Sequence, residues 1–174
     1  CEELKNQNNV FDVDVTKLII NVNNSGITGK QLGDILRYKY NIEVEMDSLK
    51  YVLGITTICD DYKELERLAE ALKEIDKSLE EKQNENISVE LLKNKRMYSI
   101  YETDLKEKNT VNLFDSKDCI SGEFVFLYPP GIPLVVPGEV ITEELLEQIK
   151  VYLEANMNIS GLKDNSNKTI EVVK

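Results

Sequence analysis

The side chains that most often carry enzyme chemistry are unevenly represented in this sequence. It contains no histidine, which removes the usual general base of serine and cysteine triads and a common ligand of zinc. The cysteines, Cys1, Cys59 and Cys119, are odd in number and widely spaced, so they indicate partly buried thiols in a reducing compartment. No metal site is predicted. Any chemistry of the chain alone must come from carboxylates, tyrosines or lysines.

A second unusual feature is the segment YPPGIPLVVPGE, residues 128–139, which holds all four prolines of the chain. Proline fixes φ and has no backbone N–H. The prolines therefore predict that the chain leaves a strand at 129–130, turns, and continues over IPLVV as an extended strip at a sheet edge with its apolar side chains covered. Such a strip either closes a fold or forms a pocket wall. The motif residues are Tyr128, Pro129, Pro130, Gly131, Pro133, Pro137, Gly138 and Glu139.

The elements that position these residues can be predicted from the spacing of apolar side chains. Residues 16–22 mix β-branched and apolar side chains as a buried strand does. Thr28 and Gln31 form a capping box, which predicts a helix over 28–40. Short strands are expected at 42–46 and 51–58.

A second helix is predicted to begin at Asp61, with Glu64 completing its capping box. The order strand, helix, strand, strand, helix predicts a small α/β domain, a layered sheet with helices on one face. The apolar stripe of the second helix consists of Leu65, Leu68, Ala69, Leu72, Ile75 and Leu79.

The rest of the chain predicts a second mixed α/β domain, so the fold class is α/β in the broad α+β sense. We expect a frayed stretch at 1–9, the small domain at 10–83, a polar linker at 84–95 and the second domain at 96–174. Strands are indicated at 109–115 and 120–128. A helix capped by Thr142 should bury Leu145, Leu146, Ile149 and Leu153.

Composition limits the partners of the chain. Its formal net charge is −11, from 32 acidic and 21 basic residues, which disfavours nucleic acid and anionic membranes and favours cationic ligands. No apolar run approaches the roughly 20 residues of a membrane helix. The sequence begins at Cys1 without a visible export signal, so we expect a cytoplasmic protein and interpret the chain as a piece of a longer one.

The motif at 128–139 resembles the C-terminal motif of the bacterial ornithine, lysine and arginine decarboxylases that use pyridoxal phosphate (PLP). The similarity extends over ISGEFVFLYPPGIPLVVPGEVIT, and residues 16–46 resemble the small-domain segment of the same enzymes. It covers about residues 10–173. The resemblance implies that the chain is the C-terminal region of such an enzyme, similar to the Bacillus-type arginine or lysine decarboxylases.

By this resemblance, the intact protein would remove the α-carboxylate of a basic amino acid in polyamine biosynthesis, with PLP as the electron sink. It would act as a homo-oligomer. In the family the cofactor lysine directly follows a histidine in a large N-terminal PLP-binding domain, and this sequence has no histidine. No catalytic residue and no bound cofactor are therefore expected in this chain, which would supply pocket wall and packing surface and be inactive alone.

The resemblance also matches Glu45 to an acidic residue that, in relatives, reaches toward the far end of the substrate. An ammonium or guanidinium group in a partly dry pocket needs such a carboxylate. The bland alternative is one more solvated acid in an acidic protein. The sequence departs from the family at NKRMYSIYE and SKDC, where a Ser-Pro-Arg-like element and a glycine usually occur.

Two other functions remain open from the fold pattern alone. The βαββα order is also most of an ACT-like amino-acid-sensing module, and it suits an oligomerisation domain without a ligand. The proline motif and residues 90–174 favour the decarboxylase, because a sensing module needs neither.

Overall fold

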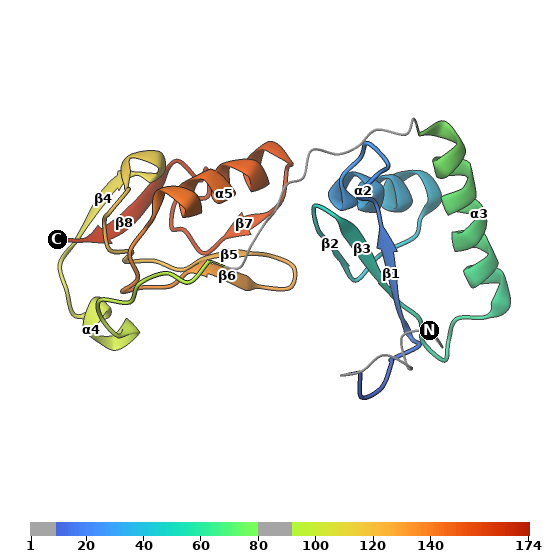
Figure 1. Cartoon of the computed structure of the whole chain (residues 1–174), viewed down its shortest axis with the longest axis horizontal. Coiled ribbons are helices and arrows are strands. Elements are labelled where there is room, and N and C mark those ends of the chain that lie inside the picture. Colours follow the sequence, from blue (N-terminus) through green and yellow to red (C-terminus); the bar gives the residue numbers. More distant parts are fainter. Residues whose placement is uncertain (1–9, 80–91) are drawn as a thin grey trace. The chain divides into compact units, whose positions relative to one another are not determined.

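The computed structural model describes residues 10–79 and 92–174, and the chain separates into two compact units, 1–86 and 87–174 (Figure 1). The stretch predicted to be frayed, 1–9, lies outside the described residues, as does the predicted linker from residue 84 to residue 91. Each unit has its own sheets and its own buried apolar residues.

The first unit has the predicted order of strand, helix, strand, strand and helix. Its sheet is antiparallel with β3 in the centre, in the order β1-β3-β2. Both helices begin with the predicted capping boxes, at Thr28 and Asp61. The elements are β1 (Lys17–Asn21), α2 (Gly29–Tyr40), β2 (Met46–Asp47), β3 (Tyr51–Ile55) and α3 (Tyr62–Ser78).

The two helices share one hydrophobic core with the sheet. Leu36 of α2 and Val52 of β3 are fully buried at its centre. Helix α3 is less covered than its apolar stripe predicts: Ala71 and Ile75 are buried, whereas the predicted Ala69 is exposed. The N-terminal half of α3 therefore leaves part of the apolar face of the sheet uncovered.

The second unit is a mixed α/β fold built on two small antiparallel sheets, ordered β6-β5-β7 and β4-β8. An isolated bridge between Ser121 and Val172 joins the stretch before β5 to β8. The elements are α4 (Ile100–Asp104), β4 (Lys108–Asn112), a 3-10 turn (Leu113–Asp115), β5 (Val125–Leu127), β6 (Ile132–Val135), α5 (Glu143–Glu154), β7 (Ile159–Ser160) and β8 (Thr169–Val173).

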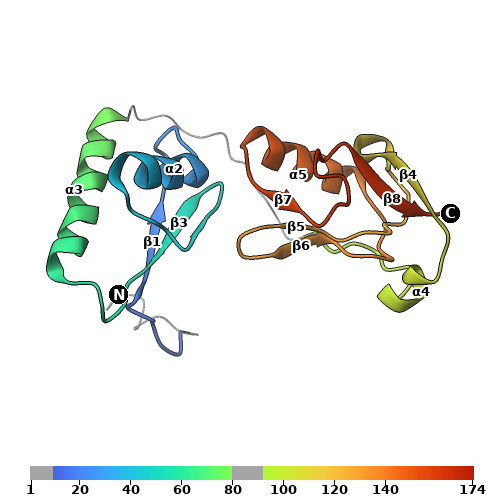
Figure 2. The same ribbon diagram turned by 180° about the vertical axis from the view of Figure 1, so that it is seen from behind.

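Helix α5 supplies much of the core of the second unit and lies beside β7 in both views (Figures 1 and 2). Thr142 caps it as predicted. Its buried face includes Tyr152 rather than the predicted Leu153, which is only half-buried. The mixed α/β fold class is confirmed. Across residues 10–79 and 92–174, no helix is both long and apolar enough to cross a membrane.

Candidate functional site

Glu45 lies immediately before the short strand β2. Its backbone N–H donates to the Leu53 carbonyl oxygen at 2.8 Å, which attaches this stretch to β3. Its side chain is exposed. The carboxylate lies close enough to Lys17 of β1 to add to the rise in the pKa of that ammonium, after the larger effect of Asp14. The strand predicted over 42–46 is shorter in the structure, and Glu45 precedes its ladder.

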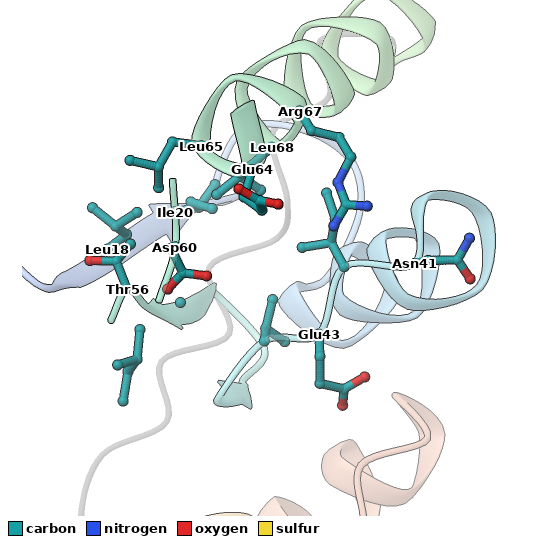
Figure 3. A pocket seen from close by; sticks show the side chains of 14 residues that line it. Leu18, Ile20, Asn41, Glu43, Thr56, Asp60, Glu64, Leu65, Arg67 and Leu68 are labelled. Atoms are coloured by element: carbon teal, nitrogen blue, oxygen red, sulfur yellow. The ribbon is translucent and has the colours of Figure 1, made fainter. Parts of the chain in front are cut away.

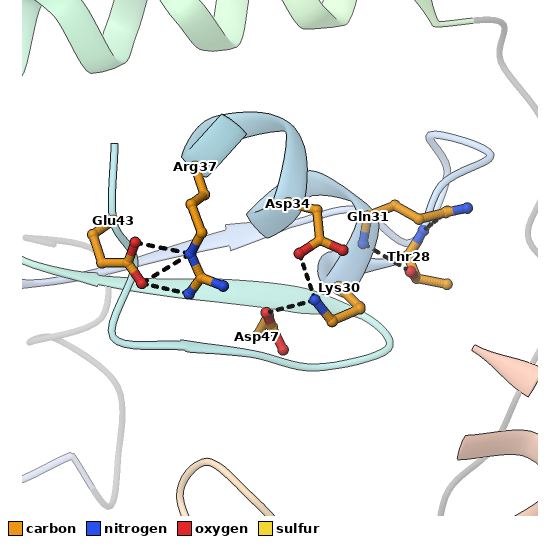
Figure 4. Close-up of polar contacts among 7 residues, drawn as sticks. All are labelled: Thr28, Lys30, Gln31, Asp34, Arg37, Glu43 and Asp47. Atoms are coloured by element: carbon orange, nitrogen blue, oxygen red, sulfur yellow. Dashed lines mark hydrogen bonds and ion pairs between the residues drawn. The ribbon is translucent and has the colours of Figure 1, made fainter. Parts of the chain in front are cut away.

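The stretch before Glu45 is attached to α2 by an ion pair (Figure 4). The Arg37 guanidinium Nε donates to both carboxylate oxygens of Glu43, at 3.0 and 2.8 Å, and Nη2 donates to the same group. These hydrogen bonds lower the pKa of Glu43 and raise that of Arg37. Glu43 is therefore already paired, whereas the Glu45 carboxylate has no hydrogen bond in the described part of the chain.

A second polar cluster lies where β2 meets α2, also in Figure 4. The Lys30 ammonium pairs with Asp34 one helical turn away and lies 3.9 Å from the Asp47 carboxylate. Burial raises the pKa of Asp47, and the positive charge of Lys30 opposes that rise. This cluster attaches the residues after Glu45 to α2, and the Arg37–Glu43 pair attaches the residues before it. The backbone of Glu45 is therefore held on both sides.

The proline motif forms the hairpin between β5 and β6 in the second unit. The chain leaves β5 at Leu127, passes through cis peptide bonds before Pro129 and Pro130, and reverses at Gly131, where φ is 105°. The Gly131 N–H donates to the Leu127 carbonyl oxygen at 2.8 Å and closes the turn. The segment is thus a closed turn between two strands.

Strand β6 lies at the edge of its sheet, the position in which a strand tolerates a proline such as Pro133. Leu134 and Val135 are buried, but Ile132 and Pro133 are exposed. The expectation that the apolar side chains of IPLVV are largely covered is therefore wrong for its first half, because the hairpin tip extends beyond the core.

The end of the motif depends on a glycine. Gly138 has a φ of 92°, and a Cβ atom added there would lie 2.2 Å from the Tyr98 carbonyl oxygen. Its N–H donates to Ser121 and its own carbonyl oxygen accepts from Met97, each at 2.8 Å. Only glycine combines this φ with this closeness.

The Glu139 carboxylate that follows is held inside the second unit. One oxygen accepts hydrogen bonds from the Val136 N–H at 3.2 Å and from the Asn94 amide at 3.3 Å, and the other lies 3.7 Å from the Arg96 guanidinium. The carboxylate therefore fastens the stretch before α4 to the end of the hairpin. Glu45 and this motif belong to different units.

A second structural carboxylate, Glu123, was not among the residues predicted from the sequence. Glu123 is buried, and its two oxygens accept the backbone N–H groups of Lys163 at 2.9 Å and of Glu171 at 2.8 Å. The available signal was an acidic residue inside an otherwise apolar strand segment. No group of three or more histidine, cysteine or carboxylate side chains that could hold a metal occurs among the described residues.

Comparisons with known proteins agree with the resemblance. Residues 80–165 match the family model of the Orn/Lys/Arg decarboxylase, C-terminal domain. The chain is 37% identical over 167 residues to an arginine decarboxylase of Bacillus subtilis (strain 168), covering 94% of this chain and 34% of that protein. It is 32% identical over 176 residues to an arginine decarboxylase of Bacillus anthracis, covering 99% of this chain and 36% of that protein.

Solved structures show the same fold. The constitutive lysine decarboxylase of E. coli matches with a TM-score of 0.71 at 17% identity, over 93% of this chain and 32% of that one. A lysine decarboxylase of Francisella novicida matches with a TM-score of 0.69 at 19% identity, over 93% and 31%. The chain spans about a third of the length of the curated relatives it matches. Residues 80–165 therefore match the Orn/Lys/Arg decarboxylase C-terminal domain, and 94% of the chain aligns with about a third of an arginine decarboxylase.

Proposed function

We propose that this chain is the C-terminal part of a cytoplasmic, PLP-dependent decarboxylase that converts arginine, lysine or ornithine into the corresponding amine and CO2 for polyamine synthesis. The observation that supports it is the alignment of 94% of the chain with an arginine decarboxylase at 37% identity. In this proposal the two units supply pocket wall and packing surface, and the intact enzyme is a homo-oligomer.

The residues at positions 10–79 and 92–174 do not fit a complete PLP site. A cofactor lysine needs a lowered pKa, yet each described lysine with a shifted pKa is shifted upward, by a hydrogen-bonding neighbour. These are Lys17, Lys39, Lys73, Lys117 and Lys163. The sequence also lacks histidine. We propose that the cofactor is held by the part of such an enzyme that corresponds to the unmatched two thirds of the relatives.

Glu45 is the residue that we propose contacts the substrate. Its carboxylate is exposed, has no hydrogen bond in the described ranges, and is placed by neighbours on both sides. A carboxylate in that state can accept hydrogen bonds from an ammonium or guanidinium group without first breaking a pair of its own. Glu43 cannot do so as readily, because Arg37 already occupies it.

A fusion protein tests the function. The matched C-terminal third of the B. subtilis arginine decarboxylase is replaced by this chain, and release of CO2 from arginine, lysine and ornithine is measured with PLP present. We expect turnover of at least one of the three. Glu45→Gln should raise KM for that amino acid about tenfold, the effect of losing one charge-assisted hydrogen bond. Glu66→Gln removes an exposed carboxylate of α3 that takes no part in placing Glu45, so it is the control and should leave KM nearly unchanged.

Two results would contradict the proposal. A folded, PLP-loaded fusion that releases no CO2 from any of the three amino acids would remove the assigned function. A Glu45→Gln fusion with unchanged kcat/KM would show that Glu45 is only a surface acid. The chain alone should release no CO2, and borohydride reduction with PLP should label no single lysine stoichiometrically.

A further inference from the structure

A pocket of about 180 Å3 opens in the first unit, beneath the N-terminal half of α3 (Figure 3). It lies between that helix, strands β1 and β3, and the stretch 41–44. It exists because α3 covers the sheet incompletely there: Leu65 remains 40% exposed although it lies on the apolar face of the helix. Neither Glu45 nor any residue of the proline motif lines it.

The floor of the pocket is apolar. Leu18 and Ile20 of β1 form its base, and Leu65 and Leu68 of α3 form its roof. Gly54 of β3 also lines it and leaves it open, because an added Cβ there would meet nothing nearer than Leu18 at 3.9 Å. An alkyl chain can therefore lie on this floor out of water.

The rim of the pocket carries charged side chains, and their hydrogen-bonding capacity is only partly used within the described residues. Asp60 accepts the Thr57 N–H at 2.6 Å through Oδ2, and Glu64 accepts the Asp61 N–H at 3.1 Å through Oε2. The second oxygen of each carboxylate accepts no backbone N–H in the described part of the chain, although the Glu64 side chain also interacts with that of Asp61. Arg67 also lines the pocket and lies three residues after Glu64 on α3. It has no ion pair within the described ranges.

Figure 3 shows the Arg67 guanidinium on one side of the opening, with the carboxylates of Glu64 and Asp60 on the other. Glu43 also lines the pocket, but Arg37 neutralises it. The rim therefore offers two carboxylates and one guanidinium, a net charge of −1.

We propose that this pocket binds a free basic α-amino acid. Such a molecule carries one carboxylate and two cationic groups joined by an alkyl chain, which is the complement of the rim and the floor. The fork of Arg67 suits the carboxylate, Asp60 and Glu64 suit the two cations, and the leucine-lined floor takes the alkyl stem. The volume lies below the roughly 300 Å3 at which drug-sized pockets begin, as expected for one amino acid. This site does not depend on the proposed decarboxylation, because it lies wholly within the first unit.

Titration of the isotope-labelled 174-residue chain, followed by two-dimensional NMR, tests the proposal without any turnover. L-Arginine and L-lysine should shift the amide signals of residues around the pocket. Agmatine lacks the carboxylate and norleucine lacks the distal cation, so each should bind at least about tenfold more weakly. Equal binding of agmatine and arginine, or no shifts at 10 mM arginine, would overturn the assignment.

Two variants of pocket residues and one control variant separate pocket binding from surface charge. Gly54→Val fills the floor at a strand position that valine favours, so it should abolish binding while the melting temperature is maintained. Arg67→Gln should remove the preference for arginine over agmatine. Lys63→Gln removes one positive charge from the same helix outside the pocket and should change neither. Undiminished arginine binding by folded Gly54→Val would refute this site.

Discussion

Two glycines of the proline motif allow a matched test of why the motif requires glycine. Gly131 and Gly138 have similar positive φ angles, 105° and 92°. Around Gly131 an added Cβ would meet nothing within 4 Å, whereas at Gly138 it would lie 2.2 Å from the Tyr98 carbonyl oxygen and 2.7 Å from Thr103 Oγ1. The same substitution, glycine to alanine, therefore changes backbone strain alone at the first site and both strain and packing at the second.

The expected costs follow from this difference. Gly131→Ala should lower the free energy of unfolding by about 1–3 kcal/mol, the strain of a non-glycine residue at such a φ. Gly138→Ala carries the same strain and must also displace backbone around Tyr98, where overpacking typically adds about 1–3 kcal/mol. The flexible end of a side chain cannot relieve the contact, because the nearest atom is a carbonyl oxygen. Gly138→Ala should thus be the more destabilising by about 1–3 kcal/mol.

Urea denaturation followed by far-ultraviolet circular dichroism gives both values, and tyrosine fluorescence gives an independent probe because the chain has no tryptophan. The two units can unfold separately, so the transition assigned to the second unit is the one to compare. Equal losses of unfolding free energy in Gly131→Ala and Gly138→Ala would refute the packing argument. No loss at Gly131 would refute the strain argument.

Other substitutions test single contacts. Thr28→Ala removes the cap of α2 and should cost about 1 kcal/mol in urea denaturation. Glu123→Gln leaves a buried backbone N–H opposite an amide donor and should cost about 1–3 kcal/mol in the same assay. Hydrogen bonds from Ser166 hold the pKa of Asp164 well below its usual 3.8, so the stability contributed by its charged form is present above that pH and is lost as pH falls below about 4. Asp164→Asn should reduce this acid sensitivity in thermal scans.

Local signals in the sequence predicted helix starts well. The capping pairs at Thr28 and Asp61 and the cap at Thr142 all begin helices in the structure, because the donor and acceptor lie within a few residues of each other. The strand expected over 42–46 was predicted less well. Only Met46–Asp47 pairs with β3, since the ladder depends on where the partner strand lies rather than on local composition.

Contacts between distant residues could not be predicted from spacing. Glu123 accepts from Lys163 and Glu171, and Glu139 accepts from Asn94, each across 40 or more positions. The apolar stripe of α3 predicted a covered helix, and nothing in its periodicity indicated that its N-terminal half would leave a pocket. How closely a helix approaches a sheet is decided by the side chains that lie opposite it.

The proline motif is the most recognisable segment of this chain, but we do not expect it to determine which ligand the chain binds. Gly138 and Glu139 are fixed by backbone closeness and by internal hydrogen bonds, so changing them should lower stability whatever the substrate. Glu45 and Arg67 are exposed and have no hydrogen bond in the described residues, and Glu45 interacts with Lys17 only through its charge, so the fold depends little on them. A change in ligand preference at unchanged stability should come from these two positions, and a change in stability at unchanged preference from the proline motif.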